Sequence, residues 1–282
     1  MESWIISEGG TLVFGTLLGT LCLAALWEAV KTRRPAQPRQ TLRWAGNLSL
    51  GVINQGLAAA FGAASSIIIA WWVAQTGVGL LARAEFGFFA SLVTTVLALE
   101  LAAYFAHRLM HQVPLLWRFH RVHHSDPVVD FTTTLRNHPL EVLTTAAVAT
   151  PVTALLGPSL AILIIYQMAR SAVVILAHSN IYLPYRLDRM LRHVIITPDY
   201  HRLHHAQDRQ FTDSNYGVFL TLFDRVFGTA SDKPFDDVGA LPVGLDYGRE
   251  MSDSKLGTLL AMPFIKETHT AIRPDSAGCP PA

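Results

Sequence analysis

The chain is poor in charged residues. Aspartate, glutamate, lysine and arginine make up only 15% of its 282 residues, against roughly 25% in an ordinary soluble domain. Hydrophobic residues make up 51%, and the mean hydropathy is +0.32. The net charge is only +1, and the sequence has no basic stripe with interleaved aromatic residues, which argues against nucleic acid as a partner. The composition therefore favours a membrane protein before any motif is considered.

Cysteine is almost absent. The two cysteines, Cys22 and Cys279, cannot supply a disulfide framework or a cysteine-ligated cluster. Any redox metal must therefore be held by other side chains. The first ten residues contain Glu2 and Glu8 but no cation, whereas a cleavable secretory signal begins with basic residues. We therefore expect no such signal at this end.

The sequence contains several long apolar runs. A helix that spans a bilayer needs about 20 mostly apolar residues. The candidates are residues 11–30, 45–73, 86–106, 140–156 and 159–177. Gly157-Pro158 separates the last two and predicts a tight hairpin. The fourth is short and contains Pro151, so it is not expected to cross the bilayer fully. We expect an all-α polytopic membrane protein with four to five transmembrane helices and a helical cytoplasmic cap.

The positive charges that follow the first apolar run predict the orientation. They are Lys31, Arg33, Arg34, Arg39 and Arg43. Because cytoplasmic loops carry an excess of lysine and arginine, this loop is expected inside and the N-terminus outside. Alternation of the later helices then places residues 107–138 and 178–205 on the cytoplasmic side.

Histidine is concentrated in short motifs within these two segments. Twelve histidines in 282 residues give an average below one per 18 residues. Residues 107–124 nevertheless contain five, and residues 201–205 contain three. The eight are His107, His111, His120, His123, His124, His201, His204 and His205. Their spacings are i, i+4 in the first motif and i, i+3, i+4 in the other two, which puts the rings of each motif on one helical face.

This pattern predicts a metal centre. Neutral imidazole is a good ligand for zinc, copper, iron and nickel. Eight converging rings exceed the four ligands of a single tetrahedral site, so they fit two metals that share the cluster. A lone pair of surface histidines would explain one motif but not three. The sequence His-Glu-x-x-His of zinc hydrolases is absent. A membrane metal-binding or metal-transport protein without redox chemistry is the alternative.

The three motifs, in this order and between apolar segments, resemble the fatty acid hydroxylase/sterol desaturase superfamily. The resemblance covers about residues 90–230 and extends beyond histidine. Its other parts are Thr-Thr-Thr-Leu-Arg-Asn-His-Pro-Leu-Glu at 132–141, Thr-Pro-Asp-Tyr before His201, Asp-Ser-Asn-Tyr-Gly at 213–217 and Asp-Arg-Val-Phe-Gly-Thr at 224–229. The family commonly has tryptophan before the closing aspartate, where this chain has Phe223.

The resemblance implies an O2-dependent lipid oxidoreductase with two iron ions, for which zinc can substitute in a purified sample. It implies the eight motif histidines as ligands and His178 as a ninth. The substrate would be a membrane lipid such as a sterol, fatty acyl or ether lipid, either hydroxylated or desaturated. No cytochrome b5-like haem motif is fused to the chain, so a separate electron donor is expected, of ferredoxin or cytochrome b5 type with its reductase.

Several other polar residues are candidates for supporting the metal ligands. They are Glu100, Tyr104, His138, Arg170, Asn180, Asp199 and Asp213. Charges within apolar helices are costly and usually functional, and Glu100 and Arg170 lie at similar depth in two of them, so we expect an ion pair between them. Asp199 and Asp213 flank the third motif and could orient ligand imidazoles. His138 could be a ligand, or could hydrogen-bond to a ligand or to Glu141.

We divide the chain into three parts. Residues 1–85 are predicted to hold the first membrane helices and a linker, and residues 86–230 a hydroxylase-like catalytic domain. Residues 231–282 are predicted to form a cytoplasmic tail, which is polar, lacks clear periodicity and is expected to pack loosely.

Overall fold

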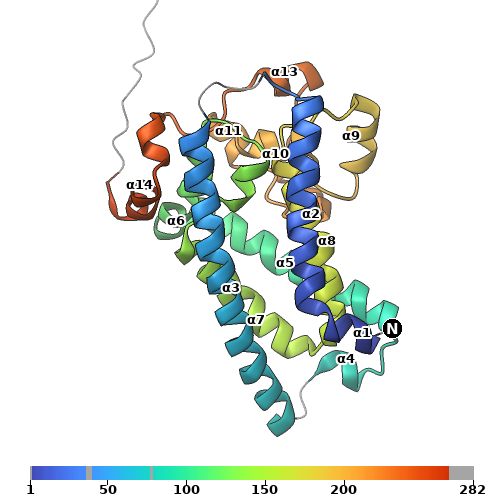
Figure 1. The fold of residues 1–282 in the computed structure, drawn as a ribbon. Coiled ribbons are helices and arrows are strands. Elements are labelled where there is room, and N and C mark those ends of the chain that lie inside the picture. Colours follow the sequence, from blue (N-terminus) through green and yellow to red (C-terminus); the bar gives the residue numbers. More distant parts are fainter. Residues whose placement is uncertain (1, 36–39, 77–78, 267–282) are drawn as a thin grey trace, which may run out of the picture.

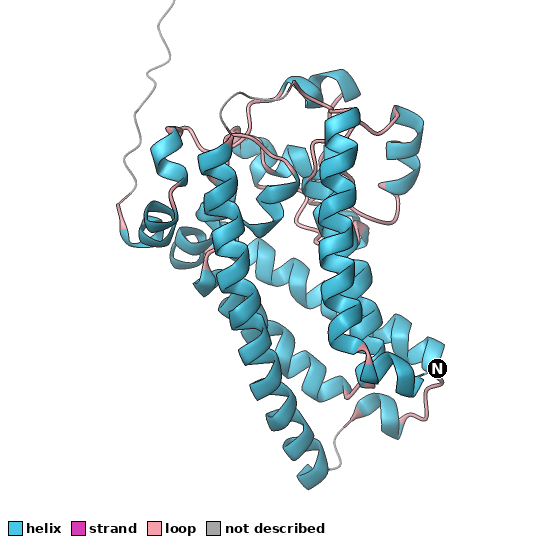
Figure 2. Cartoon of the chain, in the orientation of Figure 1, coloured by secondary structure: helices cyan, strands magenta, loops and turns pink. Residues whose placement is uncertain are grey.

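The computed structural model describes residues 2–35, 40–76 and 79–266. The protein is 71% helical, and the described residues contain no strand, only three isolated β-bridges (Figure 2). The longer helices are α2 (Gly9–Val30), α3 (Thr41–Thr76), α5 (Phe88–Gln112), α6 (Pro114–His124), α7 (Pro139–Leu156) and α8 (Leu160–His178). The prediction of an all-α fold is confirmed.

Short helices fill the connections. They are α1 (Glu2–Ser7), α4 (Leu80–Arg83), η1 (Phe131–Leu135), α9 (Tyr185–Leu191), α10 (Pro198–His204), α11 (Arg209–Thr212), α12 (Leu222–Val226), α13 (Phe235–Ala240), η2 (Met251–Ser254), α14 (Leu256–Ala261) and η3 (Met262–Phe264). Most of them gather with α6 at one end of the long helices, and we call this end the cap (Figure 1). The long helices leave the cap in one direction.

Four of the described helices, α2, α5, α7 and α8, are long and apolar enough to cross a membrane. The turn predicted at Gly157 and Pro158 is present, but the tight hairpin is not, because α7 and α8 do not pack closely on each other. Helix α7 ends at Leu156, and Gly157 adopts a left-handed conformation with φ of 60° that caps it. Helix α2 packs on α8, while α3 and α5 both pack on α7. The sidedness of the cap and the three domain boundaries stay predictions.

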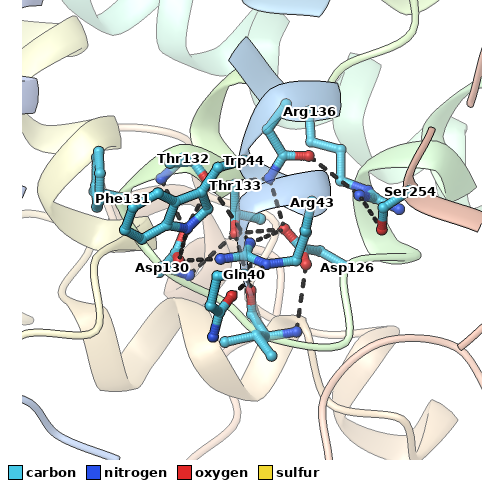
Figure 3. A network of polar contacts seen from close by, with 12 residues as sticks. Gln40, Arg43, Trp44, Asp126, Asp130, Phe131, Thr132, Thr133, Arg136 and Ser254 are labelled. Atoms are coloured by element: carbon cyan, nitrogen blue, oxygen red, sulfur yellow. Dashed lines mark hydrogen bonds and ion pairs between the residues drawn. The ribbon is translucent and has the colours of Figure 1, made fainter. Parts of the chain in front are cut away.

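A buried polar network ties α3 to the loop that follows α6 (Figure 3). Arg43 donates from Nη1 to Oδ2 of Asp126 at 2.9 Å and also pairs with Asp130. Asn47 donates to the same Asp126 oxygen at 3.1 Å and accepts from Arg136 at 3.1 Å. The two arginines, Asn47 and Asp126 are at most 1% exposed. Because every charge has an opposite charge or hydrogen-bond partner, the network can be buried and fixes how the loop leaves α6.

The segment after residue 230 was expected to pack loosely, but its described part contributes to the core. Val238 and Leu259 are fully buried, and Met262 is 8% exposed. Leu259 and Met262 belong to one apolar cluster with Leu50 of α3 and Val122 of α6. The segment was misjudged because its helices span only three to six residues, too few for an apolar period to show. Residues 267–282 lie outside the described residues.

Candidate metal centre

Helices α5, α6, α8 and α10 bring the nine predicted ligand histidines together in two clusters. Cluster A consists of His107, His111, His120, His124 and His204, and cluster B consists of His123, His178, His201 and His205. Within each cluster the candidate ligand atoms lie within 4.8 Å of one another. Neighbours in the sequence are separated: His123 and His124, and likewise His204 and His205, belong to different clusters because successive helical residues point about 100° apart.

The Nε2 atoms converge in both clusters. In cluster A, Nε2 of His120 lies 3.0 Å from that of His107, and Nε2 of His124 lies 3.1 Å from that of His204. In cluster B, Nε2 of His178 lies 3.0 Å from that of His123 and 2.9 Å from that of His201. Two nitrogens that bind one ion at about 2.1 Å and at a right angle would be about 3.0 Å apart. The spacing therefore suits neighbouring ligands of one ion.

Hydrogen bonds on the far side of the rings show why these nitrogens need a cation. Nδ1 of His107 lies 2.8 Å from the carbonyl oxygen of Tyr216, and Nδ1 of His204 lies 2.8 Å from that of Ser214. Since a carbonyl only accepts, each Nδ1 carries the hydrogen, which leaves a bare lone pair on Nε2. Nδ1 of His120 likewise faces Glu141 at 2.8 Å. Bare lone pairs that face each other at 3.0 Å repel unless a cation lies between them.

That cation is not a proton. Burial lowers the pKa of His120 to about 3 and the pKa of His124, His204 and His205 well below the usual value. The rings are therefore neutral near pH 7, the form in which imidazole binds metals. The residues present thus fit two metal ions, one for each cluster.

A cavity of about 610 Å³ opens beside both clusters. His107 and His120 of cluster A line it together with His123, His178 and His201 of cluster B. Most of the remaining wall comes from α2, α3, α5, α7 and α8, with many apolar residues such as Leu99, Val142 and Leu163. The cavity therefore connects the histidines with the apolar helices below the cap.

Comparison with known proteins shows which family the histidine-containing segment resembles. Residues 92–229 match the family model described as Fatty acid hydroxylase. Over these residues, just under half of its length, the chain matches the fatty acid hydroxylase/sterol desaturase superfamily. The match lies within the predicted catalytic segment and contains all nine histidines.

Three relatives illustrate what superfamily members do. Human alkylglycerol monooxygenase is 30% identical over 138 residues, which is 47% of this chain and 29% of that protein. The ornithine lipid hydroxylase OlsE of Rhizobium tropici is 31% identical over 135 residues, 48% of this chain and 40% of that one. The very-long-chain aldehyde decarbonylase GL1-1 of Oryza sativa subsp. indica is 30% identical over 159 residues, which is 54% of this chain and 25% of that protein. The matches thus cover less than half of each relative. No solved structure matches the chain.

Two carboxylates hydrogen-bond to rings of the clustered histidines. Glu141, in the first turn of α7, bonds to His120 and is largely buried, its side chain 9% exposed. Asp213 lies 3.3 Å from Nδ1 of His111 and is 44% exposed. Asp213 was expected to orient a ligand ring. The role of Glu141 was missed in the sequence, where it was considered only as a partner of His138, although its place in the Asn-His-Pro-Leu-Glu motif could have suggested it.

Asp199 and His138 were expected to contact the clustered histidines, but their side chains bond to other residues. Asp199 pairs with Arg33 at 3.0 Å and lies 3.7 Å from Arg202, because the linker after α2 passes over the start of α10. The ring of His138 accepts from the amide of Leu140 at 3.1 Å and caps α7. It belongs to neither cluster. Its carbonyl oxygen does accept from the amide of Glu141 at 2.9 Å, so His138 holds the residue that bonds to His120 through its backbone.

Asn180 and Tyr104 join segments around the centre. The side chain of Asn180 donates to the carbonyl of Arg34 at 2.9 Å and accepts from Arg202 at 3.2 Å. The hydroxyl of Tyr104 bonds to Thr229 at 2.9 Å, and its ring packs against Tyr216. Both residues hold neighbouring segments in place and do not bond to a ligand ring in the described part of the chain.

The expected contact between Glu100 and Arg170 is present. Nε of Arg170 lies 3.7 Å from Oε1 of Glu100, which joins α5 to α8. The same carboxylate accepts from the hydroxyl of Tyr166 at 2.6 Å and from the amide of Phe219 at 2.9 Å. Glu100 therefore also fixes the loop that leads into α12, which sequence alone did not indicate.

The closing motif is organised around Asp224. Its carboxylate accepts from the amides of Tyr216 at 2.7 Å and Gly217 at 2.8 Å. It also accepts from the hydroxyls of Tyr200 at 3.0 Å and Thr229 at 2.7 Å. The hydrogen bond from the backbone N–H of Tyr216 to Asp224 fixes this residue, and the carbonyl oxygen of Tyr216 in turn bonds to His107. The motif therefore positions a ring of cluster A through a backbone carbonyl.

Proposed function

We propose that the chain is an O2-dependent lipid oxidoreductase whose nine histidines hold two iron ions, and that it hydroxylates or desaturates a membrane lipid. The observation that carries the proposal is the cavity that joins both histidine clusters to the apolar helices. The names of the relatives, which include a monooxygenase and a lipid hydroxylase, support it. Sterol, fatty acyl and ether lipid substrates all remain compatible with it.

The chain's own residues would provide binding, orientation and exclusion of water. The carbonyl oxygens of Tyr216 and Ser214 and the carboxylate of Glu141 fix which ring nitrogen faces the metal. The buried surroundings keep the imidazoles neutral, and the apolar cavity wall shields a reactive oxidant from solvent. When bound, the iron pair would supply the activation of O2 and the removal of hydrogen from a C–H bond.

The placement of the clusters favours an enzyme over a metal transporter. His107 and His111 lie in the last two turns of α5, and His178 is the last residue of α8. All nine ligands therefore gather at one end of the spanning helices, whereas a transporter is expected to hold its ion near the bilayer midplane. We propose that this end faces the cytoplasm, where a ferredoxin or a cytochrome b5-type donor with its reductase could supply electrons.

Oxygen incorporation tests the proposal directly. The full chain, loaded with iron under nitrogen and placed in lipid nanodiscs, is supplied with a chemical reductant, a lipid extract and isotopically heavy O2. Hydroxylation predicts one heavy oxygen atom in a lipid product, and desaturation predicts loss of two hydrogens without label. His123→Ala should abolish either product, while His193→Ala, an exposed histidine in neither cluster, should retain it. Equal conversion after complete removal of iron would refute the proposal.

A further inference from the structure

The two histidine clusters differ in what surrounds their rings. In cluster A, four of the five rings have an oxygen atom beside Nδ1. The carbonyl oxygens of Tyr216 and Ser214 and the carboxylates of Glu141 and Asp213 supply these partners. Three of the four contacts are 2.8 Å long, which is an ordinary hydrogen-bond length. The rings of cluster A are therefore held on their outer side as well as at the centre.

Cluster B lacks most of this support. Nδ1 of His178 lies 2.7 Å from the carbonyl oxygen of Val174, one turn earlier in α8. In the other three rings, Nδ1 is buried and has no hydrogen-bond partner among the residues that the structure describes. These rings belong to His123, His201 and His205. Their Nε2 atoms face the centre of the cluster, as the 3.2 Å between those of His205 and His201 shows, so Nδ1 points outward.

The missing partners matter when the cluster binds a metal. A neutral imidazole that binds through Nε2 must carry its hydrogen on Nδ1. In cluster B, metal binding therefore leaves three buried N–H groups without an acceptor from the described part of the chain, and a buried donor without a partner is unfavourable. In cluster A, the same hydrogens are donated to oxygen atoms, which fix the ring orientation and raise the basicity of the ligand nitrogen.

Charge and ligand number favour cluster A as well. Its rings bond to Glu141, whose side chain is 9% exposed, and to Asp213. A nearby carboxylate attracts a divalent cation, and this attraction is strongest where solvent is excluded. No described carboxylate hydrogen-bonds to a ring of cluster B. Cluster A also offers five imidazoles against four, so all three differences point to the same cluster as the tighter site.

We propose that the two metal positions are unequal: cluster A keeps its iron firmly, whereas the iron of cluster B exchanges with the surroundings. Loss of one outer partner of a ligand imidazole typically lowers metal affinity about 10–100-fold, so we expect the two affinities to differ at least about tenfold. Because the proposed oxidation needs both ions, a protein that holds iron only in cluster A is inactive, and filling of cluster B switches it on. This inference rests on the proposed function and adds regulation by iron supply.

Stepwise removal of iron tests the inference without turnover. The full chain in lipid nanodiscs is loaded with two irons under nitrogen and titrated with a ferrous chelator, and elemental analysis measures the iron that stays bound. Two steps should appear, separated at least about tenfold in free iron concentration. His205→Ala should remove the weaker step and leave the stronger one, whereas His193→Ala, exposed and outside both clusters, should keep both. Glu141→Gln should shift only the stronger step, by about 10–100-fold toward the weaker one.

The outcomes separate the inference from the proposed function. Release of both irons at one free iron concentration from the unaltered protein would overturn the inference, and that measurement needs no variant to fold. A shift of the weaker step alone in Glu141→Gln would overturn the assignment of the steps to the clusters. Lipid oxidation that is undiminished after the weaker step is complete would overturn the regulation by cluster B. Two release steps with no iron-dependent oxidation of any lipid would refute the proposed function alone.

Discussion

Nδ1 of His120 lies 2.8 Å from Oε1 of Glu141, a contact that is almost fully buried. The similar contact between His111 and Asp213 is longer, at 3.3 Å, and its aspartate is 44% exposed. Both carboxylates face the Nδ1 atom of a clustered histidine. They therefore offer a comparison of the same interaction with and without exposure to solvent.

Glu141→Gln should weaken iron binding much more than Asp213→Asn. Loss of a buried partner of a ligand imidazole typically lowers metal affinity about 10–100-fold. An exposed ion pair contributes at most about 1 kcal/mol, or roughly fivefold. Competition with a coloured iron chelator under nitrogen measures both affinities. An equal loss in the two variants, or a larger loss in Asp213→Asn, would contradict the assignment of Glu141.

Glu100→Gln should destabilise the protein more than Arg170→Met. Glu100 is 1% exposed and accepts from Tyr166 and two backbone amides, so its loss should cost about 3 kcal/mol. Arg170 is 25% exposed and solvent screens its contact, so its loss should cost about 1 kcal/mol. Chemical unfolding in detergent measures both, with the exposed Glu85→Gln as the control. Strictly additive effects in the double variant would show that the two side chains do not interact.

Asp126→Asn should be among the most destabilising single changes in the cap. Asp126 accepts from Arg43, Asn47 and Thr133 in the buried network of Figure 3. Breaking a buried pair on one side typically costs 3–5 kcal/mol, and because Asp130 still pairs with Arg43 we expect a loss of about 3 kcal/mol. The matched control is Asp236→Asn, because Asp236 is exposed. Similar unfolding curves for the two variants would contradict the role of the network.

The sequence predicted which histidines gather in the clusters because their spacing is a local property of a helix. Spacings of three and four residues place rings on one helical face whatever the tertiary fold. His178 could be placed only by resemblance, since it is a single histidine at a helix end. The division into two clusters depends on how α6 and α10 cross, and no local pattern fixes that crossing.

The supporting contacts were harder to predict for the same reason. Asp199 lies beside the third motif in sequence, yet its partner Arg33 comes from a linker 166 residues away. The carbonyl oxygens of Tyr216 and Ser214 leave no sequence signal, because every residue has one. The contact between Glu100 and Arg170 was predictable, since two charges at similar depth in apolar helices have few other partners available.

The two clusters should lose metal independently. They share no histidine, so His123→Ala removes one of four ligands from cluster B, and His124→Ala removes one of five from cluster A. We expect the unaltered protein to retain two irons after anaerobic loading and a chelator wash. His123→Ala should retain one, and His124→Ala should retain between one and two, because four ligands remain in its cluster. Elemental analysis of purified protein measures this, with the exposed His193→Ala as the control. Loss of both ions from His123→Ala, or a single ion in the unaltered protein, would show that the nine histidines form one site.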